Sequence, residues 1–239
     1  MPGNDMIHLA VAMVILVLTH IFCLAAMTER KYSVRKTALI YGVFGVLFIG
    51  LTLVVFALFG SGSANTAFVS FTGTALMAFF MFILTSADAF CKKLFLFISH
   101  SNLFCIFFCI AILVCNSLFP ELSETGTLYV RNLVRTLLYL LAVLGYLRFL
   151  RPYVRMVPGT KKRTWYSISL VSMLFLVVFI AFVIFLYADY GHELETIFLF
   201  AAVVLLYASV LWVIFGTIRY MSDESKMELI GKNAEYLQG

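Results

Sequence analysis

The segment VAMVILVLTHIFCLAAM, residues 11–27, indicates the fold class of this chain. It is apolar on all sides and lacks the alternation of apolar and polar residues that marks a strand of a membrane β-barrel. A backbone surrounded by lipid must satisfy its own hydrogen bonds, which leaves the α-helix for such a segment. Similar apolar runs recur along the 239 residues. The sequence therefore predicts an all-α integral membrane protein.

The composition favours a lipid bilayer over water as the surrounding solvent. Apolar residues make up 63% of the chain and charged residues 12%, and the mean hydropathy is +1.04. Soluble domains are about 45–50% apolar and about 25% charged. A surface that faces water needs more charge than this chain has, so a large soluble core does not explain the difference. We expect a multi-pass protein of the cell membrane, with the lipid bilayer as its main partner.

Polar and turn segments divide the chain into seven expected spans that form a helical bundle. Each span has about 20 residues or more, which is enough to cross a hydrocarbon layer of about 30 Å. The leader MPGND has no basic residue, unlike a secretory signal, so we expect the first span to be retained. Residues 1–220 form the predicted membrane domain, and residues 221–239 form a coiled-coil-like linker helix. The expected spans are Met6–Met27, Ala38–Phe59, Phe68–Phe90, Leu94–Phe119, Leu128–Leu150, Ile168–Tyr187 and Thr196–Tyr220.

The basic residues predict the orientation of the bundle. With seven spans, every lysine and arginine except Arg131 and Arg135 falls on one side of the membrane. Short loops rich in these residues face the cytoplasm, so the N-terminus is expected outside and the C-terminus inside. The net charge of +5 then reflects topology and headgroup attraction, and we expect no nucleic-acid partner. The basic loop that contains Trp165 and Tyr166 is expected to contact anionic headgroups.

The two outlying arginines lie in the fifth expected span. A charge at mid-helix costs about 2.5–3.5 kcal/mol on insertion scales, which makes Arg131 and Arg135 functional candidates. Together with Asn132 they lie on roughly one helical face. Two guanidinium groups at this spacing repel each other unless an anion lies between them. A ligand carboxylate or phosphate is one source, since arginine binds both in bidentate geometry.

An internal partner is the alternative to a ligand at this site. Snorkelling of the arginines to the outer headgroups, combined with an ion pair to a loop, would also satisfy the two charges. The candidate acidic partners are Glu121 and Glu124, which precede the helical part of this span, and Asp189, Glu193 and Glu195 in the last outer loop.

Histidines near the ends of the spans are further candidates. His8 and His192 are both expected on the outer side, where they can line the same crevice as Arg131. Thr19 and His20, inside the first span, are expected to hydrogen-bond to another helix.

The polar tetrad SHSN, residues 99–102, interrupts an apolar region. If the fourth span starts at Leu94, the tetrad lies about two turns inside the membrane, and His100 and Asn102 can transmit helix movement. If the span starts at Leu103, the preceding stretch is an interfacial helix.

The segment SDESKMELIGKNAEYLQG, residues 222–239, follows the last span. Ser222 and Asp223 are expected to cap this helix or to start a new one. Two heptads are too short for dimerisation by themselves. A dimerising output helix and a frayed amphipathic tail on the membrane are the two interpretations. The coiled-coil seam, with spacings of three, four and three, is formed by Met227, Ile230, Ala234 and Leu237.

Patterns typical of enzymes and metal centres are not found. The chain has no HExxH, GxSxG or Walker sequence, and the expected spans contain no lysine for a retinal Schiff base. The five cysteines show no CxxC spacing, and Cys105 and Cys109 are expected to pack as small apolar residues. Asp88 and Lys92, four residues apart, are expected to form a local ion pair. We expect no catalytic residue, no cofactor and no metal.

The segments KKLFLFISHSNLF, Lys92–Phe104, and SKMELIGKNAEYLQ, Ser225–Gln238, resemble those of Gram-positive receptor histidine kinases. These bacterial proteins join a multi-span membrane sensor to a GHKL-type ATPase and are related to the Agr-type peptide-pheromone receptors. The resemblance implies a two-component receptor that detects an extracellular small molecule or peptide. It also implies a homodimer that signals through its C-terminal helix to a kinase domain.

This sequence departs from that family in two ways. The phosphoacceptor histidine motif and the ATP-binding boxes do not occur in it, and the receptors are usually described with fewer spans than the seven expected here. A small multi-span transporter or channel is the alternative function, although the apolar middle of most spans argues against it. An integral membrane enzyme is a third possibility, disfavoured by the missing acid–base and metal-binding residues.

Overall fold

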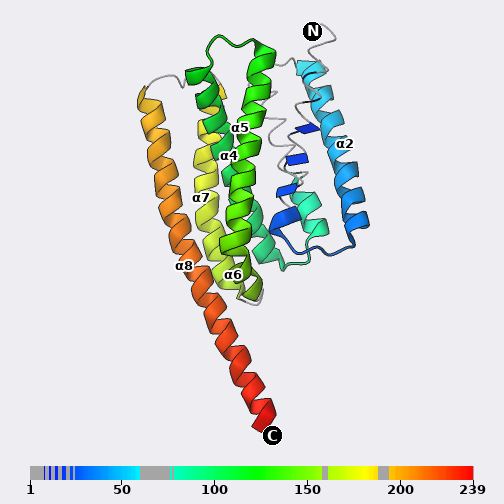
Figure 1. Cartoon of the computed structure of the whole chain (residues 1–239), viewed down its shortest axis with the longest axis vertical. Coiled ribbons are helices and arrows are strands. Elements are labelled where there is room, and N and C mark those ends of the chain that lie inside the picture. Colours follow the sequence, from blue (N-terminus) through cyan, green and yellow to red (C-terminus); the bar gives the residue numbers. More distant parts are fainter. Residues whose placement is uncertain are drawn as a thin grey trace.

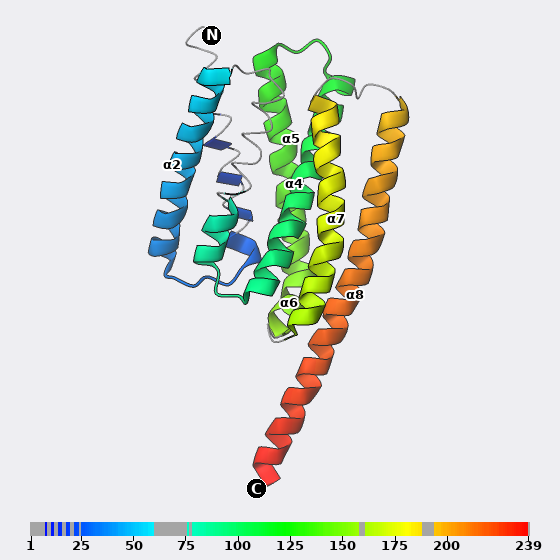
Figure 2. The same cartoon turned by 180° about the vertical axis from the view of Figure 1, so that it is seen from behind.

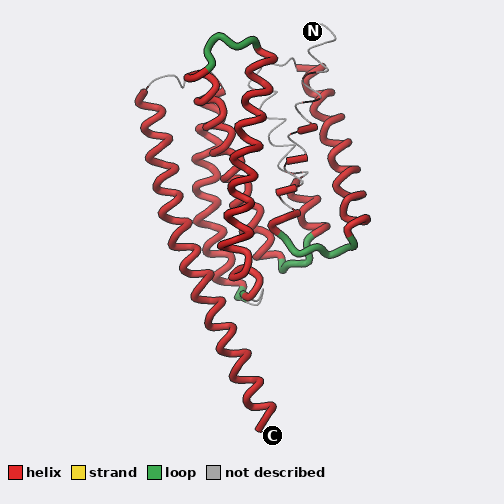
Figure 3. The backbone as a smooth tube through the Cα atoms, in the orientation of Figure 1, coloured by secondary structure: helices red, strands yellow, loops and turns green. Residues whose placement is uncertain are grey.

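The computed structural model describes residues 8, 11, 14, 15, 18, 19, 22, 23, 25–59, 76, 78–157, 161–187 and 194–238. These residues form long helices that lie side by side in a bundle (Figure 1, Figure 3). Within this part of the chain, extended pairing is limited to an isolated bridge between Arg30 and Ser86. The predicted all-α fold class is therefore confirmed.

The described helices match five of the seven expected spans in position. Helical stretches long and apolar enough to cross a membrane cover Val34–Val55, Phe90–Leu118, Thr125–Met156, Lys162–Leu186 and Glu195–Ala234. Half of the first expected span and 9 of the 23 residues of the third lie outside the described residues. The helices are α2 (Val34–Phe59), α4 (Phe90–Leu118), α5 (Glu124–Gly145), the π-helical turn η1 (Tyr146–Leu150), α6 (Arg151–Met156), α7 (Lys162–Tyr187) and α8 (Leu194–Gln238).

The outer surface of these helices is strongly apolar. Val46 and Leu58 on α2 are 71% and 72% exposed, and Trp212 on α8 is 76% exposed. Soluble monomers rarely expose contiguous apolar patches larger than a few hundred Å². A lipid bilayer covers such surfaces with hydrocarbon, so the described helices fit a membrane protein.

Helix α4 is the central element of the bundle. It packs against α5 and α7 and lies among them in both views (Figure 1, Figure 2). In the most apolar stretch of α4, 56% is buried inside the protein, whereas the share in the most apolar stretch of α8 is 17%. The helix begins at Phe90, so the SHSN tetrad lies well inside it. The observed helix start at Phe90 is therefore closer to the expected span start at Leu94 than to the alternative start at Leu103, which required an interfacial helix.

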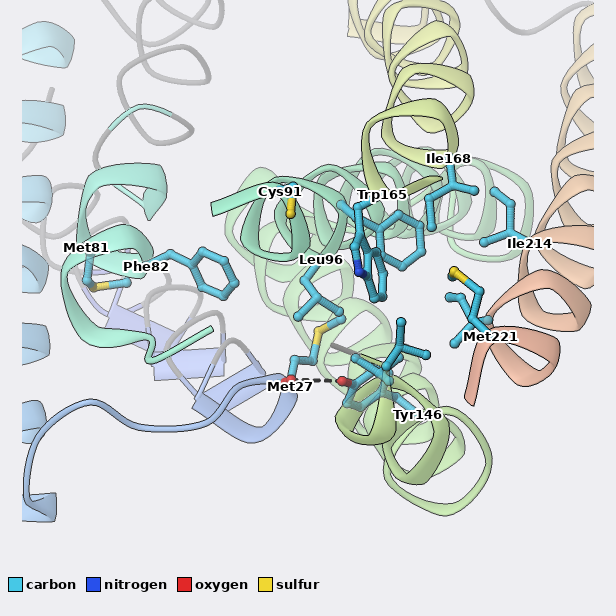
Figure 4. Close-up of a cluster of buried hydrophobic side chains, with 14 of the residues drawn as sticks. Met27, Met81, Phe82, Cys91, Leu96, Tyr146, Trp165, Ile168, Ile214 and Met221 are labelled. Atoms are coloured by element: carbon cyan, nitrogen blue, oxygen red, sulfur yellow. Dashed lines mark hydrogen bonds between the residues drawn. The ribbon is translucent and has the colours of Figure 1, made fainter. Parts of the chain in front are cut away.

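The two ends of the bundle are called here the loop end and the tail end. The loop end contains the α4–α5 connection, and at the tail end α8 extends beyond the bundle (Figure 1). A large core cluster at the tail end includes Leu96, Tyr146 and Trp165 (Figure 4). The Tyr146 hydroxyl donates to the Met27 carbonyl oxygen at 2.8 Å, which ties η1 to the segment before α2 (Figure 4).

Trp165 is placed differently from the headgroup contact predicted for its loop. Its side chain is fully buried, 5.7 Å from the ring of Phe95, whereas the neighbouring Tyr166 is 44% exposed. The indole fills the tail-end core, and burial of its large apolar surface outweighs a place at the membrane interface. Trp165 therefore takes no part in headgroup contact, which stays a prediction for the basic residues of this loop.

Pro152 explains the π-helical turn between α5 and α6. Proline cannot donate a backbone hydrogen bond, and its ring clashes with the carbonyl four residues earlier, here that of Arg148. The helix widens just before it, and the Arg151 N–H bonds to the carbonyl of Tyr146. The helical path then continues to Met156, six residues beyond the expected end of the fifth span at Leu150.

Helix α8 is continuous over 45 residues, a length of about 68 Å at about 1.5 Å per residue. The predicted cap or new helix start at Ser222 and Asp223 was wrong. Ser222 faces the bundle and is fully buried, so packing rather than cap preference decides its conformation. The described side chains from Lys226 to Ala234 are all exposed, and this end of α8 stands clear of the other helices (Figure 1).

Candidate functional site

Arg131, Asn132 and Arg135 lie on one face of α5, as predicted, and this face is turned toward α4. Arg135 donates from Nη2 to Asn132 Oδ1 and from Nε to the Arg131 carbonyl, the latter at 3.3 Å. Arg131 Nη2 donates across the interface to Oδ1 of Asn116 on α4 at 3.3 Å. These four residues are called the arginine cluster.

The arginine cluster contains two positive charges and only neutral hydrogen-bond partners. Arg135 is 7% exposed and its guanidinium carbon lies 5.3 Å from the ring centre of Phe108, a cation–π contact. Among the described residues neither arginine forms an ion pair, and Arg131 Nε is buried without a hydrogen-bond partner. Buried charges in proteins are normally paired. The cluster therefore has the electrostatics of an anion site.

The internal partners considered from the sequence do not neutralise these charges within the described residues. Glu121 and Glu195 are exposed and pair with neither arginine. The Glu124 side chain and residues Asp189 and Glu193 lie outside the described residues. Arg135 points into the protein rather than toward the surface, which contradicts snorkelling for this side chain.

His8 lies at the same end of the bundle as the arginine cluster. Its Nδ1 is hydrogen-bonded to the hydroxyl of Tyr129 at 2.8 Å, and the two rings meet edge to face at 5.7 Å. Tyr129 precedes Arg131 by two residues on α5. The structure therefore packs His8 against α5 two residues before Arg131, whereas His192 lies outside the described residues.

Thr19 adds a weaker contact between the first expected span and α5. Its hydroxyl lies 3.4 Å from that of Thr136 and also donates to the carbonyl of Ile15 at 2.8 Å. The expected helix–helix hydrogen bond of Thr19 is confirmed, whereas His20 lies outside the described residues.

A second buried polar group joins α4, α7 and α8. The Asn102 amide nitrogen donates to the Ser172 carbonyl at 2.9 Å and to the Tyr207 hydroxyl at 3.0 Å. Asn102 is fully buried, and its Oδ1 has no hydrogen-bond partner among the described residues. These three residues are called the amide cluster. One side chain thus connects three helices.

His100 faces the α4–α5 interface rather than the amide cluster. It is 3% exposed, and its ring centre lies 5.7 Å from that of Tyr139. Tyr139 follows Arg135 by one turn of α5 and packs edge-on against Phe107 at 5.1 Å. His100 and Asn102 therefore point to two different sets of neighbours, although the sequence placed them in one tetrad.

Sequence reasoning missed the residues that complete both clusters. Asn116 and Tyr207 are polar residues near or within apolar runs, which is the signal that could have marked them, whereas Ser172 takes part through its backbone carbonyl and no side chain marks it. Their partners depend on which helices pack together, and no local pattern contains that information. Asp88 and Lys92 form the expected ion pair at 3.2 Å, since both residues belong to adjacent turns.

Cys105 and Cys109 pack inside the core cluster at the loop end, together with Cys23. All five cysteines are buried, and none of them forms a disulfide among the described residues. Among the described residues, no three histidine, cysteine or acidic side chains are grouped to hold a metal.

Comparison with known proteins gives no relative: no protein-family model, no curated protein and no solved structure matches this chain. Functional conclusions rest on the residues themselves.

Proposed function

We propose that this chain is the membrane receptor module of a bacterial sensor histidine kinase. In this proposal seven spans place the N-terminus outside and the C-terminus in the cytoplasm. An extracellular anionic small molecule or peptide binds at the arginine cluster, and α8 carries the signal inward to a kinase domain. The observation that carries the proposal is the pair of buried Arg135 and half-buried Arg131, whose hydrogen-bond partners among the described residues are all neutral.

The arginine cluster has the chemistry to recognise a carboxylate or a phosphate. A guanidinium group offers planar paired donors, and hydrogen bonds between charged groups are about twice as strong as neutral ones. Arg131 Nε is a buried donor without a described partner, so an incoming oxyanion gains a bond that the free protein lacks. Asn116 on α4 and Asn132 on α5 orient the two arginines.

Helix α4 connects the proposed input to the proposed output. Asn116 of α4 belongs to the arginine cluster and bonds to Arg131. Asn102, about 20 Å away along the same helix, bonds to Tyr207 of α8. A ligand that binds more tightly to one position of α4 relative to α5 shifts the population of that position. Asn102 Oδ1 has no hydrogen-bond partner among the described residues. Because this acceptor is free to form a bond in another arrangement, the contact between α4 and α8 is suited to a change of conformation.

The proposed output is a homodimer formed through α8. Met227 and Ile230 are 70% and 63% exposed, and Ala234 of the same seam is also exposed. The heptad spacing continues backward through Asp223, Gly216, Ser209 and Ala202, all exposed on the face opposite the bundle. A side chain at Gly216 would meet nothing in this chain, so its backbone is open to close approach by a second helix.

Ligand binding tests the input in the full chain reconstituted in lipid nanodiscs. Short peptides with a free terminal carboxylate are compared with the same peptides amidated, and the change in melting temperature is measured. We expect stabilisation by the carboxylates only, and its loss in Arg135→Gln. Stability without ligand gives a second test: Arg135→Gln is expected to unfold no more easily than wild type. A large loss of stability would mean that the charge is structural.

Cysteine labelling tests the topology. Glu121→Cys and Met227→Cys lie at opposite ends of the described bundle, and the native cysteines are buried. In intact cells a membrane-impermeant maleimide is expected to label position 121 and not position 227. The reverse pattern would invert the proposed orientation and remove the arginine cluster from the outside.

A further inference from the structure

A pocket at the tail end lies apart from both polar clusters. Its volume is about 440 Å³, and it is formed by the segment 28–34, which leads into α2, and by Arg151 and Arg155 of α6. This size is within the range of pockets that hold small molecules, about 300–1,000 Å³. The pocket is open to the surface at the end of the apolar part of α2.

Backbone hydrogen bonds hold one wall of the pocket in place. The Lys31 N–H donates to the Thr85 carbonyl, and the Ala87 N–H donates to the Glu29 carbonyl, both at 2.8 Å. Arg30 lies between these two bonds and forms the isolated bridge with Ser86. The segment 28–34 is therefore fixed against the chain that precedes α4.

The pocket has an excess of positive charge. Arg30, Arg151 and Arg155 line it with a single carboxylate, Glu29, which pairs with Arg155 at 3.0 Å. Among the described residues Arg30 and Arg151 form no ion pair. The nearby Asp88 is already paired with a lysine on α4.

The amino end of α2 adds to the positive charge of the pocket. Ser33 and Val34 line the pocket at the start of the helix, and the Lys36 N–H bonds to Ser33 Oγ at 3.4 Å. The first turn of α2 has no acidic residue to balance the helix dipole. The partial positive charge at a helix start favours an anion, and phosphate groups bind well there.

The surface beside the pocket favours a lipid as the source of that anion. Val34 lines the pocket and is 62% exposed, and an exposed apolar ridge with a spacing of four residues continues from it along α2 through Ala38, Gly42 and Val46. An acyl chain can lie along this face while the headgroup occupies the pocket. Basic pockets between membrane helices are known to suit anionic headgroups.

We propose that the pocket binds the phosphate group of an anionic glycerophospholipid, held by Arg30, Arg151 and the amino end of α2, with an acyl chain along α2. This site does not depend on the arginine cluster or on the receptor proposal. Arg155 is the residue that keeps Glu29 from occupying the pocket, because the two side chains pair with each other.

Native mass spectrometry of the full chain in detergent tests the proposal. Binding of phosphatidylglycerol and of phosphatidylcholine is measured for the wild type and for the double variant Arg30→Gln/Arg151→Gln. We expect the wild type to prefer phosphatidylglycerol, and the double variant to lose at least about 10-fold in its affinity. The matched control Lys226→Gln/Lys232→Gln removes the same charge from exposed positions on the part of α8 beyond the bundle and should retain wild-type affinity within about 2-fold.

Two further measurements test the role of charge and distinguish a lipid from a free ion. The variant Arg30→Lys/Arg151→Lys keeps both charges and is expected to recover most of the lost affinity. Inorganic phosphate at millimolar concentration distinguishes a lipid from a free ion, because a lipid site binds phosphatidylglycerol far more tightly. Equal loss of phosphatidylglycerol in the pocket and control variants would overturn the pocket, and a stronger response to inorganic phosphate would overturn the lipid assignment.

Discussion

The arginine cluster and the amide cluster each include an asparagine of α4, Asn116 and Asn102, but they differ in how their polar groups are compensated. The amide nitrogen of Asn102 uses both hydrogens on acceptors from α7 and α8. The two arginines have only neutral acceptors, and no described carboxylate pairs with them. The Asn102 amide nitrogen, which bonds to two other helices, holds the bundle together, whereas in our proposal the uncompensated pair of charges is completed by an anion. We therefore propose that the amide cluster stabilises the bundle and that the arginine cluster recognises the ligand.

The largest effect is expected from Arg135→Gln. Glutamine retains a hydrogen bond to Asn132 but removes the charge, so affinity for a carboxylate ligand should fall on the order of 100-fold. Ligand-induced thermal shift in nanodiscs measures this loss. Arg163→Gln, an exposed arginine on α7, is the control and should behave as wild type. Unchanged affinity in Arg135→Gln would break the comparison, because the cluster would then not be a recognition site.

Asn102→Leu should have the largest effect on stability. It removes two buried hydrogen bonds and leaves the Ser172 carbonyl and the Tyr207 hydroxyl without this donor, at a cost of about 1–3 kcal/mol. Denaturation followed by circular dichroism measures the change in the free energy of unfolding. Tyr207→Phe removes one of the two acceptors and should cost about half as much. If Arg135→Gln destabilises the protein more than Asn102→Leu, the two clusters have been assigned the wrong way round.

The amide cluster contacts α8 through Tyr207, whereas the described contacts of the arginine cluster are with α4 and α5. The effect of the amide cluster on α8 can therefore be measured at the proposed dimer seam. Met227→Cys should form an intermolecular disulfide faster than Leu229→Cys, by about 5-fold, since Leu229 is 61% exposed but lies off the seam. Non-reducing electrophoresis after mild oxidation measures the rate. Equal rates at both positions would contradict a specific α8 interface. Adding Asn102→Leu should alter the rate at position 227.

His8→Phe is expected to have the smallest effect. Phenylalanine keeps the edge-to-face contact with Tyr129 and loses the hydrogen bond, so stability should fall by about 0.5–1.5 kcal/mol. Ligand affinity should fall by no more than a few-fold, because the described hydrogen bond of His8 goes to Tyr129, which is not part of the arginine cluster. A loss as large as that of Arg135→Gln would extend the recognition site to the first expected span.

The sequence predicted those parts of the clusters that depend on local helix geometry. Arg131, Asn132 and Arg135 share a face because helical spacing requires it, and the Asp88–Lys92 ion pair follows from the same rule. Asn116 and Tyr207 were missed as partners because the packing of α4 against α5 and α8 is not encoded by any local pattern. Ser222 has a good capping side chain, but burial against the bundle overrides that preference.

The unbroken path of α8 has a mechanical consequence. From Tyr207 to Gln238 the helix contains no proline and no interruption, over about 46 Å. Such a helix acts as a lever arm that turns about Tyr207, with its free end beyond the bundle. A tilt of ~5° at Tyr207 displaces the far end by ~4 Å, about three quarters of the ~5.4 Å pitch of an α-helix. In the proposed receptor, a small shift of the Asn102 amide would thereby become a movement of several ångströms at the end of α8.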